Sequence, residues 1–304
     1  MNVVESMLPQ FLNEMLKNQY GEDNYSKIVH GYNSRRYTTL RVNTIKTDIN
    51  TIKNILKEKQ IEFEEVEWFN EALIIKNVTE KEIEKLDIYE NGEIYLQSLS
   101  SMLPPIILEP KEKENILDMT AAPGGKTTQM AAITNNNAMI TACEMNNIRF
   151  ERLKYNLEKQ GATSVYAMMT DARKMDDFFS FDKILLDAPC SGSGTINIKD
   201  INLKKNFTEK LVNKSAVIQI ALLKKAIKML KKGNIMVYST CSILSKENEE
   251  VIEKILKEEN AEILPIEFKG IEKIPKLKTS ITGTLCVCPN ELYEGFFVVK
   301  LRKK

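Results

Sequence analysis

The sequence predicts an α/β protein, with a Rossmann-like, doubly wound, mostly parallel sheet and a small N-terminal α+β module. From residue 115 onward, short apolar runs alternate with amphipathic helical segments, as in the strand–helix–strand crossovers of a parallel sheet. Earlier strand-like runs are separated by turns and short helices. The 304 residues suffice for one large domain and an appendage, so we expect a module over residues 1–93 and a large domain over residues 94–304.

Apolar spacing and turn residues define the expected elements. Asp48 is the expected N-cap of a helix over residues 48–59, and Pro104-Pro105 are expected to end a connecting helix that starts at residue 98. In the module we also expect a helix over 7–17, strands over 37–43, 61–68 and 72–76, and a short helix over 79–86. In the large domain we expect strands over 115–119, 138–143, 164–169, 183–186, 234–238 and 296–301, and helices over 126–133, 148–159, 209–232 and 246–258.

Composition excludes several classes of protein. Hydrophobic residues make up 43% and charged residues 28%, which is typical of a globular chain. No apolar run approaches the roughly 18 residues that cross a bilayer, and the acid-containing N-terminus is unlike a signal peptide. Five cysteines, an odd number, favour the reducing cytoplasm over a disulfide scaffold. The single histidine, His30, excludes most histidine-based triads and histidine-ligated metals, and we expect it at the surface.

The net charge of +1 conceals an uneven distribution. Residues 62–93 carry 11 acidic and 3 basic residues, whereas residues 199–232 carry 10 lysines and 2 acids. Such a positive excess can attract a partner that bears phosphates. A solvated, lysine-rich helix face is the simpler interpretation and stays open.

A glycine-containing turn follows the first strand of the large domain. The segment Asp118-Met-Thr-Ala-Ala-Pro-Gly-Gly-Lys-Thr joins a strand to a helix, and its two glycines let the backbone approach a ligand closely. Glu144 lies 19 residues after Gly125, where an acid can bind the ribose hydroxyls of an adenosine-containing cofactor. Asp171 follows the third strand, where it could meet an adenine amino group. The residues expected to form the cofactor turn are Thr120, Ala121, Ala122, Pro123, Gly124, Gly125 and Lys126.

Two phosphate-binding motifs compete for the same segment. A P-loop needs a glycine where Thr120 stands, and the G-x-G-x-x-G pattern of dinucleotide sites is absent. S-adenosylmethionine carries no phosphate, so neither pattern is required for it. An ordinary strand–helix turn remains an equal alternative for this segment taken alone.

Two cysteines follow neighbouring strands of the expected sheet. Asp187-Ala-Pro-Cys190-Ser-Gly-Ser-Gly comes after the fourth strand, and Ser239-Thr-Cys241-Ser comes after the fifth. Because both turns leave the carboxyl edge of a parallel sheet, we expect Asp187 and both cysteines to meet in one cleft. A lone cysteine is usually a small buried hydrophobe, which is what we expect of Cys143. Cys286 and Cys288 have no second ligand pair, so we expect strand residues and no metal there.

These motifs together resemble the Sun-type RNA cytosine-5 methyltransferases, and most closely the archaeal tRNA 5-methylcytosine enzymes. The Pro-Cys and Thr-Cys pair in this order is highly specific. The resemblance covers the chain from about residue 35 to its end, and its pieces are Arg41-Val-Asn43, Tyr95-Leu-Gln97, Ser101-Met-Leu-Pro104, Asp118–Lys126, Asp187–Gly192, Ser239–Ser242 and Glu294-Gly-Phe-Phe297. The chain departs from many relatives at residues 286–290, where they carry a basic residue and a Pro-His.

The resemblance implies roles for the residues of the cleft. Cys241 would be the nucleophile that adds to carbon 6 of cytosine, and Cys190 would assist its release. Asp187 would hydrogen-bond ring nitrogen 3, and Lys126 is the cation expected to favour the thiolate. The methyl donor would be S-adenosyl-L-methionine. Cofactor contacts are implied for Glu144, Arg149, Asp171 and Asp187, and RNA contacts for Arg35, Arg36, Arg41 and Asn43.

The expected function is therefore methylation of carbon 5 of cytosine in RNA. The chain lacks the extensions of many ribosomal-RNA enzymes, so transfer RNA is the favoured substrate and ribosomal RNA the alternative. An amino-group methyltransferase, a P-loop-like NTPase and a non-catalytic RNA-binding protein also stay open. We expect a cytoplasmic monomer that uses neither a membrane nor a metal.

Overall fold

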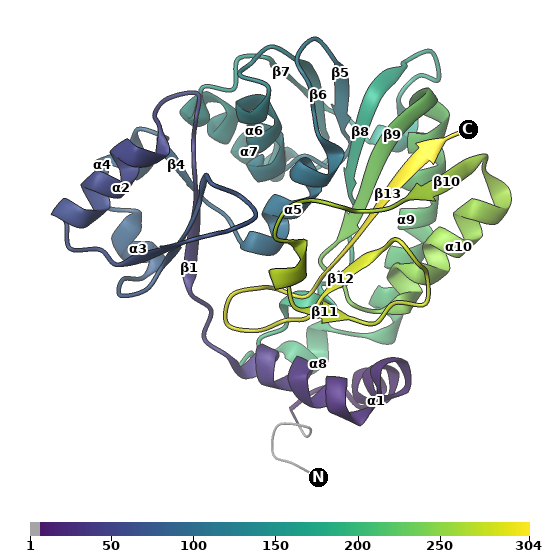
Figure 1. Cartoon of the computed structure of the whole chain (residues 1–304). Coiled ribbons are helices and arrows are strands. Elements are labelled where there is room, and N and C mark those ends of the chain that lie inside the picture. Colours follow the sequence, from purple (N-terminus) through teal and green to yellow (C-terminus); the bar gives the residue numbers. More distant parts are fainter. Residues whose placement is uncertain (1–6) are drawn as a thin grey trace.

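The computed structural model describes residues 7–304 and is built on a nine-stranded sheet of order β11-β12-β13-β9-β8-β5-β6-β7, with β10 paired to β13 (Figure 1). Strands β5 to β9 pair in parallel, and β10 to β13 join them in antiparallel fashion. The strands are β5 (Asn115–Asp118), β6 (Met139–Glu144), β7 (Val165–Met169), β8 (Phe181–Asp187), β9 (Leu230–Thr240), β10 (Ala261–Leu264), β11 (Lys276–Leu277), β12 (Leu285–Val287) and β13 (Phe296–Lys303).

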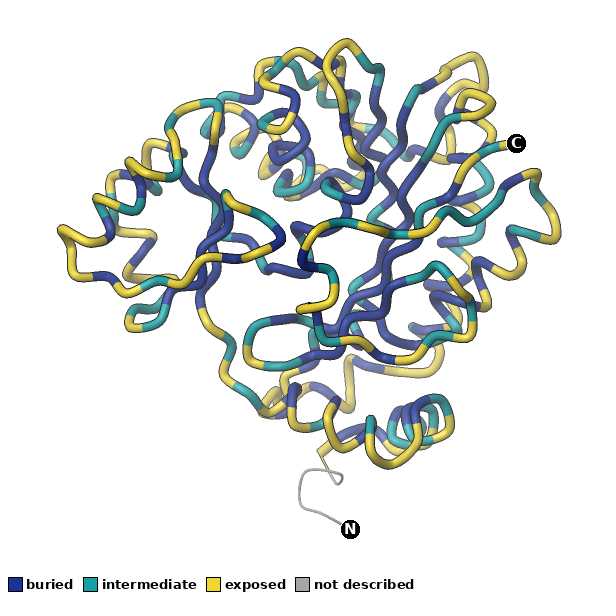
Figure 2. Tube along the Cα trace, in the orientation of Figure 1, coloured by how far each residue is buried: buried dark blue, intermediate teal, exposed yellow. Residues whose placement is uncertain are grey.

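Helices cover both faces of this sheet because successive strand residues point to opposite sides. Ile184 and Leu186 of β8 pack against one group of helices, and Leu185 packs against the other. The first group is α1 (Gln10–Asn33), α9 (Glu209–Met229) and α10 (Glu249–Glu258), and the second is α5 (Leu99–Leu108), α6 (Gly125–Ile133) and α7 (Asn147–Gln160). The strands form the buried centre of the molecule (Figure 2). The expected α/β class is confirmed.

A four-stranded antiparallel sheet of order β2-β3-β1-β4 forms the N-terminal module and has its own apolar cluster. Asp48 accepts hydrogen bonds from the backbone N–H groups of Asn50 and Thr51, which confirms it as the N-cap of α2. The elements are β1 (Thr38–Val42), α2 (Ile49–Glu58), β2 (Phe63–Glu65), β3 (Ala72–Ile75), α3 (Glu80–Ile83), α4 (Asp87–Glu90) and β4 (Ile94–Leu96).

Helix α1 is much longer than the expected 7–17 and packs on the large domain. Its regular apolar spacing is interrupted at Gly21, whose φ of 73° is not helical, and resumes at Tyr25. The hydroxyl groups of Tyr20 and Tyr32 donate to the carbonyl groups of Ile243 and Ser193. The first residues of the expected module therefore pack against the large domain, beside the turn that follows β9.

Other differences have local causes. Helix α5 was expected to end at Pro104 and Pro105 but continues through them. Pro105 has no backbone N–H to donate to the Ser101 carbonyl, which instead accepts a hydrogen bond from Gln97 Nε2 at 3.1 Å. The expected strand over 61–68 is only three residues long, and the helix over 79–86 divides into α3 and α4. Residues 230–233 extend β9 rather than α9. Among residues 7–304, no helix combines the length and apolar character needed to cross a membrane.

Candidate active site

The parallel pairing of β8 with β9 places both cysteine turns side by side. Asp187, the last residue of β8, lies opposite Ser239 of β9, and the Ser239 hydroxyl donates to Asp187 Oδ1 at 2.7 Å. The two turns start from this point on the carboxyl edge of the sheet. They meet again where Gly194 N–H donates to the carbonyl of Cys241.

The sulfur atoms of Cys190 and Cys241 are 2.9 Å apart and share a hydrogen bond. Both cysteines are free and half-buried, and Cys241 lines a cavity. The hydrogen bond with Cys241, followed by burial, raises the pKa of Cys190 well above its ordinary value. Cys190 therefore stays a thiol at neutral pH and can donate its proton to the neighbouring sulfur.

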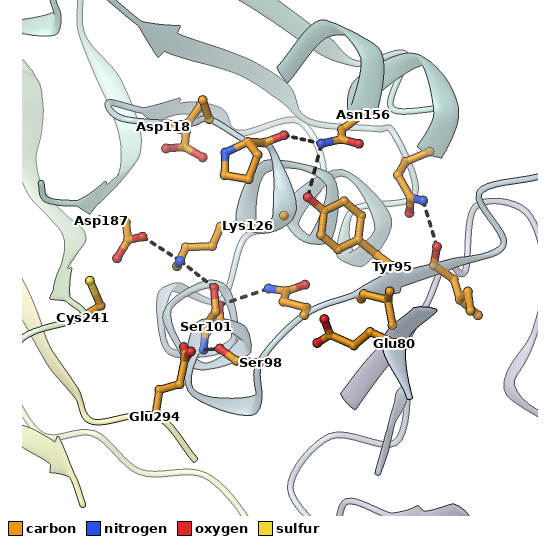
Figure 3. Close-up of a pocket in the computed structure, with 18 of the residues that line it drawn as sticks. Glu80, Tyr95, Ser98, Ser101, Asp118, Lys126, Asn156, Asp187, Cys241 and Glu294 are labelled. Carbon is orange, nitrogen blue, oxygen red and sulfur yellow. Dashed lines mark hydrogen bonds and ion pairs between the residues drawn. The ribbon is translucent and has the colours of Figure 1, made fainter. Parts of the chain in front are cut away.

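Lys126 and Asp187 form an ion pair beside these sulfurs. Lys126 Nζ lies 2.6 Å from Asp187 Oδ2 and donates to Ser101 Oγ at 2.7 Å (Figure 3). The ammonium group also lies 5.5 Å from the centre of the Phe296 ring. Lys126 was expected to be the cation nearest to Cys241, whereas the structure pairs it directly with Asp187.

The glycine turn brings its backbone to the same cavity. Gly124 is the N-cap of α6 with a φ of 110°, a conformation that side chains disfavour. Within the described chain, Asp118 Oδ1 is buried without a hydrogen-bond partner, while Oδ2 accepts from Thr127 at 2.7 Å. Burial raises the pKa of Asp118 to about 6. An unpartnered carboxylate oxygen beside an open glycine turn fits a polar ligand that donates hydrogen bonds.

The cavity has a volume of about 630 Å³ and runs from the cysteine turn to the N-terminal module. Tyr95 of β4 forms part of its wall, and Asn156 joins it by donating to the Tyr95 hydroxyl and to the carbonyl of Pro123 (Figure 3). Besides Cys241, Asp187 and the glycine turn, the lining includes Ser98, Ser101, Thr195, Glu294 and Phe296. The sequence assigned no role to these five residues, although three of them lie in the quoted motifs.

Glu144, Arg149 and Asp171 lie beyond the lining of this cavity. Arg149 Nη2 donates to the carbonyl of Ala122 at 2.7 Å, and Arg149 Nε lies 3.5 Å from Glu144, so both residues adjoin the glycine turn. Asp171 pairs with Arg173 at 2.7 Å, and that hydrogen bond lowers its pKa. Glu144 is the last residue of β6, and Asp171 follows the neighbouring strand β7, which is the placement that an adenosine site requires. Their contacts with a cofactor stay a prediction.

Arg41 and Asn43, for which RNA contacts were expected, are both buried. Arg41 is 1% exposed and donates to Gln97 Oε1 at 3.1 Å and to Thr128 Oγ1 at 3.0 Å, and burial lowers its pKa to about 10. The Asn43 amide donates to the carbonyls of Gly92 and Gln160. These side chains fasten the module to α6 and α7. In this structure, the motif Arg41-Val-Asn43 therefore links the N-terminal module to the large domain.

The remaining sequence expectations concern the other cysteines, His30 and metals. Cys143, Cys286 and Cys288 are buried, with Cys286 in β12, and His30 is exposed. Across residues 7–304, no group of three potential metal-ligating side chains is found.

Comparison with known proteins places this site in a family. Residues 105–302 match the family described as 16S rRNA methyltransferase RsmB/F, and residues 8–80 match its ferredoxin-like domain. The chain belongs to the RsmB/F methyltransferase family. The methyl donor of this family is S-adenosyl-L-methionine, and the glycine turn with its unpartnered carboxylate oxygen fits such a ligand.

Individual relatives of this RsmB/F member agree with the family match. A probable ribosomal RNA small subunit methyltransferase B of Bacillus subtilis is 32% identical, over 99% of this chain and 67% of that protein. A ribosomal RNA small subunit methyltransferase F of Shewanella amazonensis is 33% identical, over 87% of this chain and 58% of that protein, so the chain spans little more than half of its length. A methyltransferase homologue from Pyrococcus horikoshii superimposes with a TM-score of 0.85 at 30% identity and complete coverage of both chains.

The buried position of Arg41 can be tested against exposed Arg35. Arg41→Ala leaves the Gln97 and Thr128 side chains without their donor and opens a cavity, so we expect a loss of about 3 kcal/mol in the free energy of unfolding. Urea denaturation measures this loss. Arg35→Ala should leave stability within about 0.5 kcal/mol of the wild type. Equal stability of the two variants would contradict the bridging role of Arg41.

Asp118 should make the stability depend on pH. Its pKa is about 6 in the folded chain and 3.8 ordinarily, so the folded state binds the proton more tightly. Ionising this buried carboxyl costs about 3 kcal/mol above pH 6, and the cost vanishes below pH 4. Asp118→Asn should therefore unfold at a higher temperature than the wild type at pH 7. A calorimetric gain at pH 7 that persists undiminished at pH 4 would contradict this origin.

Proposed function

We propose that the chain methylates carbon 5 of cytosine in RNA through a transient bond to Cys241, and that ribosomal RNA is its substrate. The observation that carries the proposal is the 2.9 Å contact between the sulfurs of Cys190 and Cys241. Cys241 lines the same cavity as the glycine turn. An amino-group methyltransferase or an NTPase has no use for two adjacent thiols. The names of the relatives favour ribosomal RNA over the transfer RNA that the sequence favoured.

Carbon 5 of cytosine is a poor nucleophile until a thiolate adds to carbon 6. Cys241 forms that carbon–sulfur bond, and the electron pair of the 5,6 double bond becomes available at carbon 5. Nitrogen 3 takes up a proton, which the Lys126 ammonium can deliver through Asp187. S-adenosylmethionine, when bound, supplies an electrophilic methyl group. The target base must leave its stack to reach this cavity.

Release requires loss of the proton on carbon 5 and cleavage of the bond to Cys241. The electron pair of the broken C–H bond restores the 5,6 double bond, and the Cys241 sulfur departs with the electrons of the C–S bond. The Cys190 thiol lies within hydrogen-bond distance of that sulfur and can protonate it as it leaves, and the resulting Cys190 thiolate can take up the proton lost from carbon 5. The proton on nitrogen 3 returns to the Lys126–Asp187 pair.

The RNA strand needs cations near the cavity mouth. Arg35 and Arg36 line a second cavity of about 750 Å³ together with Lys76 and Lys81. Glu80 lines both cavities, so the two adjoin. We assign phosphate contacts to these side chains in place of buried Arg41.

The two cysteines should give opposite phenotypes. Cys241→Ala should abolish transfer of labelled methyl groups to RNA, because Cys241 is the only cysteine among residues 7–304 that lines the cavity. Cys190→Ala should trap a protein–RNA adduct that survives a denaturing gel. Cys288→Ala, outside the cleft, should behave like the wild type. Methylation that survives Cys241→Ala would identify an amino-group enzyme, and ATP hydrolysis abolished by Lys126→Ala would identify an NTPase.

Bisulfite sequencing of RNA from a deletion strain distinguishes the substrates. We expect a cytosine of the small-subunit ribosomal RNA to lose its methyl group when the gene is deleted and to regain it when the wild-type gene is restored. The gene with Cys241→Ala is the matched control and should not restore it. Loss confined to transfer RNA would overturn the assignment to ribosomal RNA and leave the chemistry intact.

A further inference from the structure

A buried carboxylate joins the two cysteine turns. Glu247 lies in the 3₁₀ turn η3 (Ser245–Glu247) and is 0% exposed. Its Oε1 atom accepts the backbone N–H of Ser191 at 2.6 Å, and Oε2 accepts the hydroxyl of Ser191 at 2.5 Å and that of Ser242 at 2.6 Å. Ser191 directly follows Cys190, and Ser242 directly follows Cys241. One side chain therefore spans the backbone beside both thiols.

We propose that Glu247 is a positioning residue that holds the Cys190 thiol against the Cys241 sulfur for release of the methylated base. The inference rests on the proposed function for the release step alone. The spacing of the two thiols is a property of the free protein and can be measured separately.

The two turns depend on Glu247 to different degrees. The Cys241 turn has further anchors, because Thr240 Oγ1 donates to Asn248 Oδ1 at 2.6 Å and Asn248 Nδ2 donates to the carbonyl of Ser242 at 2.9 Å. Among residues 7–304, both hydrogen bonds made by Ser191 go to Glu247. The residues on either side are held elsewhere, because the Pro189 carbonyl accepts from Gln219 and the Ser193 carbonyl from Tyr32, so removal of the carboxylate should loosen this turn locally, at Ser191 and Cys190.

The environment fixes the carboxylate itself. The Tyr238 hydroxyl donates to the Glu247 carbonyl at 2.7 Å, and Gln219 Nε2 lies 3.4 Å from Oε1 while also donating to the carbonyl of Pro189. Within the described chain, no lysine or arginine forms an ion pair with Glu247, so hydrogen bonds alone stabilise a carboxylate at 0% exposure. Hydrogen bonds to a charged acceptor are about twice as strong as neutral ones. Such a group can hold two loops in one geometry.

The consequence is a selective effect on release. Cys241 should still add to cytosine when the carboxylate is absent, because its own turn remains anchored. The Cys190 thiol should spend less time within reach of the departing sulfur. Loss of one hydrogen bond to a charged group corresponds to at least about a tenfold change in rate. Breakdown of the adduct should slow by that factor, and its formation by much less.

The first measurement needs no RNA. Diamide oxidises two adjacent thiols to a disulfide, as each sulfur loses a proton and the electron pair reduces the N=N bond of the reagent. The rate of Cys190–Cys241 cross-linking, followed by mass spectrometry of tryptic peptides, reports how closely the thiols are held. Glu247→Ala and Ser191→Ala should cross-link about tenfold more slowly than the wild type, and Glu247→Gln, which keeps an acceptor for the Ser191 N–H, should be intermediate.

The matched control is Glu250→Gln, because Glu250 lies three residues after Glu247, is exposed, and pairs with Lys246 at 2.9 Å. It should cross-link at the wild-type rate. If Glu247→Ala does not fold, as judged by circular dichroism, Ser191→Ala carries the measurement, because it removes a single hydroxyl from a half-buried loop. Wild-type cross-linking by the folded variants overturns the proposal.

The second measurement follows the adduct in a single turnover with labelled RNA and S-adenosylmethionine. Glu247→Ala and Ser191→Ala should form the adduct at nearly the wild-type rate and accumulate it, as Cys190→Ala does. Equal slowing of formation and breakdown, or an unchanged breakdown rate, overturns the role in release. Absence of any adduct even in Cys190→Ala refutes the proposed function, and cross-linking still decides whether Glu247 sets the distance between the thiols.

Discussion

The pairing of β8 with β9 is the constraint on which the site depends. These strands are parallel neighbours in register, so Asp187 stands opposite Ser239, and the turns that follow must leave the same edge of the sheet. Any slip of one residue would turn the side chains of a strand to the opposite face and separate the thiols. Ile184, Leu185 and Leu186 anchor β8 to the core on both faces of the sheet, and the hydrogen bond from Ser239 to Asp187 joins the two strands where the turns begin.

Two of the carboxylates at this edge of the sheet have their oxygens satisfied by neighbouring polar groups. Glu247 is held by hydroxyl and backbone donors, and Asp187 by Ser239 and Lys126. Asp118 differs from both, because one of its oxygens has no partner in the described chain and burial raises its pKa. Asp118 thus lowers the stability of the fold while it leaves an oxygen free to accept a hydrogen bond from a ligand, a common trade-off at functional sites.

The sequence predicted the fold class, the cleft and the convergence of both cysteines, because strand–turn–helix patterns dictate which ends of a parallel sheet meet. It could not predict that Glu247 is buried between the two turns, since a glutamate in an amphipathic helical pattern is usually exposed to solvent. It also could not reveal that Arg41 is buried, because residue type alone does not distinguish an exposed arginine from one that bridges to Gln97. Helix α1 was underestimated because Gly21 interrupts its apolar spacing.

Attack by the Cys241 sulfur on an unstacked pyrimidine is the central claim, and RNA that contains 5-fluorocytosine tests it most directly. Fluorine at carbon 5 cannot be lost as a proton is, so the base stays bound to its nucleophile in the wild-type protein. Tryptic digestion and mass spectrometry then identify the modified cysteine. The account predicts a nucleotide on Cys241 in the presence of S-adenosylmethionine. A nucleotide on Cys190, or none on any cysteine while ordinary RNA is methylated, would contradict it.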